Sequence, residues 1–190
     1  MILFVLLVSR QGKVRLAKWY SPYTLSERSK VIRELSGIIL NRGPKLCNFV
    51  EWRGFRVVYR RYAGLYFCLC VDEKDNELEV LDIIHHYVEI LDRYFGSVCE
   101  LDLIFNFHKV TFSSSSFFPF PERIVMEITR QSVRACVQAY YILDEILIAG
   151  ELQESSKRSV IRLVGTHDSL VETAKEQATS LSSVIAQVTK

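Results

Sequence analysis

The sequence has few of the features that mark secreted, membrane-spanning or nucleic-acid-binding proteins. No apolar run approaches the ~20 residues of a membrane-spanning helix. A formal net charge of +2 is too small for a broad polyanion-binding surface, although four arginines cluster between positions 53 and 61. The five cysteines are scattered and odd in number, which argues against a disulfide framework and favours a reducing compartment. These absences predict a soluble, cytoplasmic protein that does not bind nucleic acid.

Catalytic and metal-binding signatures are also missing. The sequence contains no P-loop, no G-x-G-x-x-G and no G-x-S-x-G motif. The adjacent His85 and His86 would diverge by about 100° on a helix and could not share a metal. The C-x-C of Cys68 and Cys70 has no second pair of ligands at metal-site spacing. We therefore expect no enzymatic activity, no cofactor and no metal ion.

Two strand-like runs open the chain. The first, MILFVLLVS, imitates the apolar core of a signal peptide, but it lacks a basic segment before it and a small-residue cleavage site after it. It leads through SRQGK, whose Gly12 allows a tight connection, into a second run from Val14 to Tyr20. The pattern predicts a β-hairpin.

A helix and a three-stranded meander should follow. Thr24 and Glu27 have the spacing of a capping box, and Gly43 with Pro44 ends the helical pattern. Three short β-like runs come next, separated by Arg-Gly and Ala-Gly pairs that suit hairpin turns. These runs are residues 47–52, 55–61 and 65–71.

Two more helices complete the pattern. Apolar residues recur every three or four positions from Glu77 to Phe95. Ser97 and Glu100 then have capping-box spacing for a helix that runs through Phe107. The order β-β-α-β-β-β-α-α predicts an α+β fold, with a five-stranded antiparallel sheet packed against helices.

The segment from Val110 to Gln138 interrupts this last helix. A run of four serines, 113–116, and two prolines, Pro119 and Pro121, prevent a helix from continuing through it. If the segment is removed, Lys109 abuts Ala139 and the apolar residues recur in steps of three and four. We therefore predict an inserted segment that splits one helix into two, with a loop over residues 110–121 and a helix from about residue 122 to 149.

The end of the chain should form a separate helical extension. Residues 1–155 are assigned to the main domain and residues 156–190 to the extension, whose apolar face suits packing on a partner. Gly165 lowers helix propensity, so we expect a bend or break between Gly165 and His167.

Several stretches resemble a known family. VVYRRYAGLYF, GKVRLAKWY, NFVEW, VCELDLIFNF and AYYILDEILIAGEL are similar to the sigma (small) subunits of heterotetrameric clathrin adaptor complexes, most of all to plant subunits of the trans-Golgi/endosomal type. The similarity covers residues 1–109 and 139–155.

This resemblance implies a longin-like fold and a non-enzymatic role in vesicle-mediated protein sorting between the trans-Golgi network and endosomes. The implied partners are a gamma-type large adaptin, a beta-type large adaptin and a medium (mu) chain. Clathrin, an ARF-type GTPase and phosphoinositide membranes would be contacted indirectly.

The resemblance also implies a site for acidic dileucine sorting signals on cargo tails. Arg15 matches the basic contact, and Ser97 lies at the polar edge, where some relatives have Asn. From the sequence alone, most of the apolar positions would be assigned to the core. The positions that match the apolar pocket are Ala63, Leu65, Val88, Val98 and Leu103.

Two alternatives remain at this point. One is a zeta-type small chain of coatomer. The other is a longin-type trafficking regulator, such as a SNARE or a GTPase platform, which should carry a heptad core and a membrane anchor after the longin unit.

The segment 110–138 departs from the family pattern. It opens with Val, whose codons begin with GT, and closes with Gln, one of whose codons is CAG. Its Ser, Phe and Pro residues are what pyrimidine-rich DNA encodes. We therefore favour a retained intron over a genuine lineage-specific loop.

Overall fold

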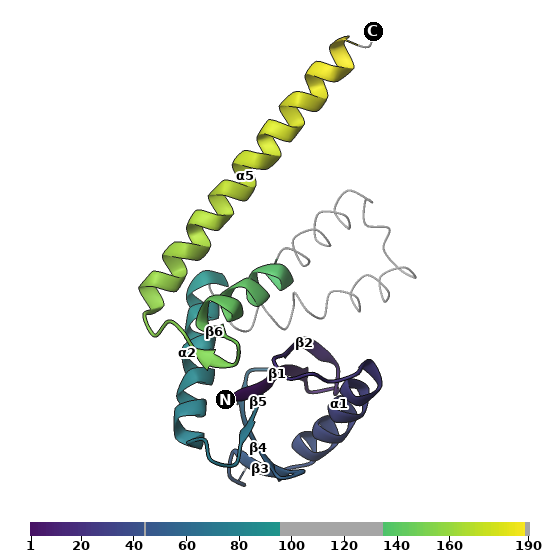
Figure 1. Ribbon diagram of the computed structural model, residues 1–190, viewed down its shortest axis with the longest axis vertical. Coiled ribbons are helices and arrows are strands. Elements are labelled where there is room, and N and C mark those ends of the chain that lie inside the picture. Colours follow the sequence, from purple (N-terminus) through teal and green to yellow (C-terminus); the bar gives the residue numbers. More distant parts are fainter. Residues whose placement is uncertain (44, 96–134, 189–190) are drawn as a thin grey trace.

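The computed structural model describes residues 1–43, 45–95 and 135–188, which form a five-stranded antiparallel sheet with helices on both faces (Figure 1). The strand order is β2-β1-β5-β4-β3, so the three-stranded meander and the opening hairpin join through the pairing of β1 with β5. The predicted α+β class and the order of its first seven elements are confirmed. The strands are β1 (Ile2–Ser9), β2 (Val14–Trp19), β3 (Phe49–Trp52), β4 (Phe55–Tyr62) and β5 (Leu65–Asp72).

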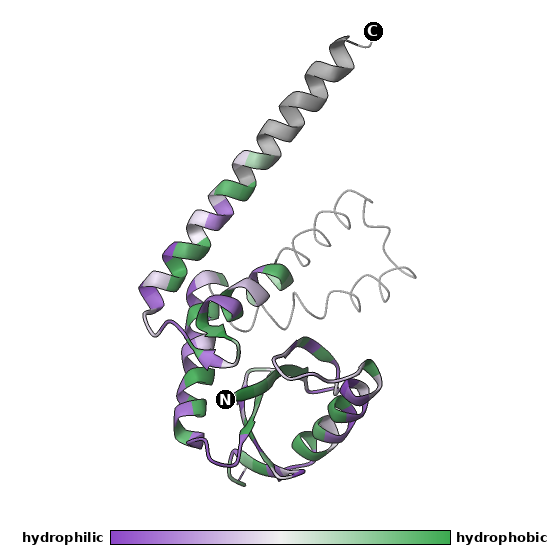
Figure 2. Cartoon of the chain, viewed as in Figure 1, coloured by the Kyte–Doolittle hydropathy of each residue, from purple (hydrophilic) through white to green (hydrophobic). Residues whose placement is uncertain are grey.

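The sheet separates the hydrophobic core into two layers, and helices cover each layer. Helix α1 (Leu25–Leu40) packs on one face of the sheet. Helix α2 (Glu77–Phe95) and a helix over residues 135–146 pack on the other. Every residue of β1 is buried, because this central strand is covered on both faces. Figure 2 shows β1 as a mainly hydrophobic ribbon. Because both faces of this strand are buried, its residues are apolar throughout, and its sequence therefore imitates a signal peptide.

The local sequence signals at α1 and the β3–β4 turn are present in the structure. Thr24 caps α1: the backbone N–H of Glu27 donates to the Thr24 hydroxyl, and the backbone N–H of Thr24 donates to the Glu27 carboxylate, which completes a capping box. Arg53 and Gly54 join β3 to β4 with φ angles of 53° and 78°, which are typical of a two-residue hairpin turn. Here the short-range pattern was sufficient to predict the structure.

The helix predicted to reach residue 149 ends earlier. Residues 135–146 are helical, but Leu147–Ile148 form β6, which pairs with β7 (Glu151–Leu152). Ala149 and Gly150 turn between them, with φ angles of 53° and 83°. The backbone N–H of Ile2 donates to the carbonyl of Gly150 at 2.8 Å, which ties this hairpin to β1. A tertiary hydrogen bond therefore replaces the last helical turn.

The predicted break near Gly165 is wrong. Helix α5 runs without interruption from Lys157 to Val188 and extends away from the sheet (Figure 1). Glycine costs a helix only about 1 kcal/mol relative to alanine, and contacts on both sides of Gly165 offset that cost. Val164 is buried in the core, and the ring of His167 stacks on Tyr141 with a centroid separation of 4.3 Å. The extension is thus part of the core over its first turns.

Other expectations lie outside the described residues. They concern the helix through Phe107, the loop over residues 110–121 and the start of the second helix. The last four residues of the predicted insert, 135–138, are described and are helical. Gln138 is buried there and donates to Asp168 of α5, which also accepts from Tyr94.

Candidate functional site: one end of the sheet

The expected cargo-binding residues that the structure describes converge on one end of the sheet. Arg15 lies in β2, Ala63 in the turn between β4 and β5, Leu65 at the start of β5 and Val88 in the second half of α2. The other three expected positions, Ser97, Val98 and Leu103, lie outside the described residues. The structure therefore describes four of the seven positions.

Two turns meet at this end. The backbone N–H of Arg10 donates to the carbonyl of Gly64 at 3.2 Å, and Ser9 is the register partner of Leu65. The β1–β2 turn is therefore fixed beside the β4–β5 turn, where Ala63 is exposed and has a φ of 49°. Four exposed cations gather around these turns, and we refer to them as the basic end: Arg10, Lys13, Arg60 and Arg61.

Arg15 occupies an irregular position in β2. Leu16 is the register partner of Leu7, and Val14 is the partner of Val8, so Arg15 is the extra residue of a β-bulge. Bulges redirect side chains and often occur next to binding sites. Arg15 is half-buried, close in sequence to the basic end.

The apolar residues of the site lie beneath this surface. Leu65 is 0% exposed and Val88 is 5% exposed, and both belong to the core between the sheet and α2. The ring of Tyr62 contacts Phe67 edge to face, and its hydroxyl lies 3.1 Å from Nδ1 of His85 in α2. These contacts fix α2 over the start of β5.

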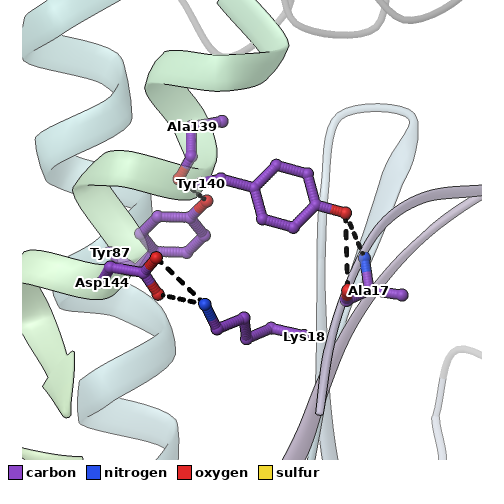
Figure 3. Close-up of polar contacts among 6 residues, drawn as sticks. All are labelled: Ala17, Lys18, Tyr87, Ala139, Tyr140 and Asp144. Carbon is purple, nitrogen blue, oxygen red and sulfur yellow. Dashed lines mark hydrogen bonds and ion pairs between the residues drawn. The ribbon is translucent and has the colours of Figure 1, made fainter.

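The helix over residues 135–146 is fastened to both sides of this core (Figure 3). The hydroxyl of Tyr87 in α2 donates to the carbonyl of Ala139 at 2.9 Å. The hydroxyl of Tyr140 accepts from the backbone N–H of Ala17 at 3.0 Å, which occupies an otherwise free edge position of β2. Nζ of Lys18 lies 2.8 Å from a carboxylate oxygen of Asp144. Helix and sheet edge thus form one unit.

Comparison with known proteins decides the family. Residues 1–134 match the model of the clathrin adaptor complex small chain. The chain is 68% identical over 190 residues to the AP-1 complex subunit sigma-1 of Arabidopsis thaliana, with 100% of both chains covered. The chain belongs to the clathrin adaptor small-chain family. As a clathrin adaptor small chain, it functions as a subunit of an adaptor complex in vesicle trafficking.

Other relatives extend this result beyond plants. The adaptor small chain is 54% identical over 169 residues to the AP-1 complex subunit sigma-2 of Dictyostelium discoideum, covering 89% of this chain and 91% of the relative. It is 47% identical over 172 residues to the human AP-1 complex subunit sigma-1A, covering 90% of each. The resemblance read from the sequence is confirmed.

A structural match supports the fold. A chain from a homology model of the full-length AP-3 complex in a stretched open conformation aligns with a TM-score of 0.59 and 24% identity. The alignment covers 93% of the adaptor small chain and 99% of that chain. The longin-like α+β fold class is thereby confirmed.

A cavity among the described residues lies elsewhere on the adaptor small chain. It is a groove of about 550 Å³ at the opposite end of β1 and β5, and none of Arg15, Ala63, Leu65 and Val88 lines it. Its floor includes Ile2, Val71 and Val80. Its acidic lining residues are Asp75, Glu79, Asp82, Glu89 and Glu151.

Several ions in this groove are paired. The terminal ammonium of Met1 pairs with Asp75, and Lys157 pairs with Glu89. Burial lowers the pKa of His86, with a further contribution from the Lys157 ammonium, while Glu89 and the backbone of Glu154 act in the opposite direction. Ion pairs between its lining residues therefore help to hold the walls of this groove together.

Cysteine and metal chemistry find no support at either end. Cys68 and Cys70 lie on the α1 side of β5, where burial raises the pKa of Cys70 to about 12, with a smaller contribution from Asp72. Across residues 1–43, 45–95 and 135–188, no three His, Cys, Asp or Glu side chains are placed to hold a metal ion. In the same ranges every helix is too short or too polar to cross a bilayer.

The sequence analysis did not identify Arg10 as a site residue. Arg60 and Arg61 were visible in the arginine cluster, but Arg10 comes from the opposite hairpin. No spacing rule connects it to Ala63, because the contact exists only through the pairing of β1 with β5.

Proposed function

We propose that this adaptor small chain binds acidic dileucine sorting signals on cargo tails at the basic end. Arg15 takes the acidic residue of the signal, and Ala63, Leu65 and Val88 form part of the pocket for the two aliphatic side chains. Ser97, Val98 and Leu103 complete the pocket by the family resemblance. The observation that carries this proposal is the convergence of Arg15, Ala63, Leu65 and Val88, from three separate elements, on one end of the sheet.

The energetics fit a transient interaction. Burial of two leucyl side chains contributes roughly 3–6 kcal/mol, and ordering an extended peptide offsets much of it. Arg15 adds about 1 kcal/mol or less, because it is partly solvated. Micromolar affinity follows, which suits a coat that must release its cargo.

The burial of Leu65 and Val88 adds a mechanistic requirement. With 0% and 5% of their surfaces exposed, neither can contact a peptide in the arrangement described here. Binding therefore requires a rearrangement that uncovers them, and part of the binding free energy drives that opening. Ala63 is already exposed and is the accessible rim of the pocket.

Variants at this rim test the site without removing core volume. Ala63→Asp places a carboxylate beside the pocket, while Ala63→Asn has the same shape without charge, and both residues tolerate positive φ. In titrations of the assembled complex with a dileucine peptide, we expect Ala63→Asp to weaken binding at least tenfold and Ala63→Asn much less. Arg15→Ser should weaken it up to about fivefold.

A peptide with both leucines replaced by alanine is the control for specificity. If it binds as tightly as the parent peptide, or if Ala63→Asp has no effect, the dileucine site is not at the basic end.

The proposal extends to the partners. The chain joins a gamma-type large adaptin, a beta-type large adaptin and a medium chain as a non-enzymatic subunit, on clathrin-coated vesicles of the trans-Golgi network and endosomes. The high identity to AP-1 sigma subunits supports this assignment. Recruitment by an ARF-type GTPase and phosphoinositides acts mainly through the other subunits.

Affinity purification of the adaptor small chain tests these partners and should recover gamma-type adaptin and clathrin. Recovery of coatomer instead would contradict it.

We also propose that residues 110–138 are an insertion, with a retained intron as its origin. Sequencing of transcripts across this junction tests the origin. A transcript that joins the codon of Lys109 directly to that of Ala139 is expected. Its absence from every tissue would support a genuine loop.

A further inference from the structure

Two arginines at the basic end share one hydrogen-bond acceptor. Nη2 of Arg10 donates to the carbonyl oxygen of Ala63 at 2.8 Å, and Nε of Arg61 donates to the same oxygen at 3.2 Å. The two donor nitrogens can therefore be no further apart than the sum of these distances. The structure fixes two positive charges next to each other around a neutral group.

Neither guanidinium has a carboxylate partner among the residues that the structure describes. Other cations of the sheet and helices do have one: Arg53 pairs with Glu34, Arg56 with Glu77 and Lys18 with Asp144. Two adjacent cations without a counter-charge repel each other, and an anion that bridges them removes that repulsion. Guanidinium groups also bind planar carboxylates through two parallel hydrogen bonds.

Contacts on both arginines hold this pair in place. Arg10 is anchored by its own N–H on Gly64, and the guanidinium of Arg61 lies over the ring of Tyr66, 5.9 Å from its centroid. Arg60, on the neighbouring position, lies over Tyr62 at 5.3 Å. Each aromatic contact limits the freedom of its cation, so less entropy is lost when an anion binds.

We propose that Arg10 and Arg61 form a second anion site, which binds an acidic side chain flanking the dileucine signal of a bound cargo peptide. This rests on the proposed function, because the shared acceptor belongs to Ala63, at the rim of the proposed pocket. The site is distinct from Arg15, which takes the acidic residue of the signal itself. Its role is to select among cargo tails that all carry the signal.

The test compares two peptides on the assembled complex. Both carry the same acidic dileucine signal; one has glutamates on its flanks and the other has glutamines at the same positions. We expect the wild-type complex to bind the glutamate peptide about three- to tenfold more tightly at low salt, and this preference to shrink as salt is raised. In the Arg10→Gln/Arg61→Gln variant the preference should disappear, so that the glutamate and glutamine peptides bind with equal affinity.

A charge-matched control is available on α1. Lys30→Gln/Arg33→Gln removes the same two charges from an exposed surface on the other side of the sheet. It should keep the preference for the glutamate peptide. An equal loss in both double variants would mean that net charge alone is responsible, and it would overturn the site.

The failures of the two proposals are distinguishable. If both peptides bind wild type equally, or the preference survives in Arg10→Gln/Arg61→Gln, the second site is wrong and the pocket stands. If neither peptide binds, both proposals fall. If the double variant instead loses binding to vesicles containing phosphoinositides while its peptide preference persists, the pair serves a membrane and the peptide assignment is overturned.

Discussion

The two ends of the central strands differ in whether their charged side chains form ion pairs. At one end, where β1 begins and β5 finishes, the lining of a groove of about 550 Å³ includes five carboxylates, and several of its ions are paired with each other. At the other end, four exposed cations surround the β1–β2 and β4–β5 turns, and Arg10 and Arg61 share a neutral carbonyl. Several carboxylates of the groove end have a cationic partner, whereas the four cations of the basic end have no carboxylate partner among the described residues.

Strand β4 shows the same contrast within eight residues. Arg56, near its start, pairs with Glu77, while Arg60 and Arg61, near its end, have no carboxylate partner in the described part of the chain. A chain with a net charge of only +2 can therefore still have a strongly basic region. The difference agrees with the proposed function, in which the basic end binds cargo. Four predictions test this difference between the two ends.

The largest effect is expected at the groove end, for Gly150→Ala. Gly150 has a φ of 83°, and a Cβ atom there would lie 2.2 Å from the carbonyl oxygen of Ile2. The backbone cannot yield without losing the hydrogen bond between Ile2 and Gly150, so we expect a loss of about 3–5 kcal/mol in urea unfolding.

The control for this prediction is Gly54→Ala, which has a φ of 78° and no atom within 4 Å of the new Cβ. It should cost only about 1–2 kcal/mol from backbone strain. Equal losses at the two glycines would show that β1 and the β6–β7 hairpin are not tightly joined.

The second prediction concerns the apolar floor of the basic end. Leu65→Ala removes a fully buried side chain and should lower the free energy of unfolding by about 3 kcal/mol. Leu78→Ala, on a residue of α2 that is 65% exposed, should change it by about 0.5 kcal/mol or less. A small effect at Leu65 would indicate that the pocket is already open in solution, which removes the need for a rearrangement on binding.

The third prediction is a pH dependence at the groove end. Burial and the Lys157 ammonium lower the pKa of His86 below its usual 6.5, although Glu89 and Glu154 oppose this shift. The unfolded chain therefore binds the proton more readily, so stability falls as pH drops below about 6.5.

Replacement of the histidine separates this effect from acid titration elsewhere. Between pH 7 and pH 5, His86→Gln should lose less stability than wild type. Identical pH profiles for wild type and His86→Gln would mean that this histidine is solvated in both states.

The smallest effect is expected at the basic end itself. Arg10→Gln/Arg61→Gln should leave the free energy of unfolding within about 0.5 kcal/mol of wild type, because these cations have no carboxylate partner to lose in the described structure. Arg56→Gln, on the same strand, breaks the pair with Glu77 and should cost about 0.5–1 kcal/mol. Thermal unfolding of both variants checks this. A larger loss in the double variant would make the basic end a structural feature.

Most elements could be predicted because their signals are local. The capping box of α1, the turn at Gly54 and the apolar period of α2 each depend on residues within a few positions of one another. The β6–β7 hairpin was missed although Ala149–Gly150 repeats the Ala-Gly pair of the β4–β5 turn. Strands of two residues have no detectable period, and the hairpin exists through its contact with Ile2.

The candidate site comes from the family resemblance and stays a prediction. The resemblance selected Arg15, Ala63, Leu65 and Val88, and these lie toward one end of the sheet. The burial of Leu65 and Val88 agrees with the sequence alone, which assigned these apolar positions to the core. The sequence could not connect Arg10 to Ala63, which are 53 positions apart.

The fold class, the order of the first seven elements and the family follow from the sequence alone, since they depend on period, caps and motif residues that lie close together along the chain. Three other features required the folded chain: α5 continues through Gly165, several carboxylates of the groove end form ion pairs, and Arg10 and Arg61 share the carbonyl of Ala63. The physical reason is that a propensity of about 1 kcal/mol is overruled by packing. Charges, for their part, interact according to their distance in space, and the pairing of β1 with β5 sets that distance.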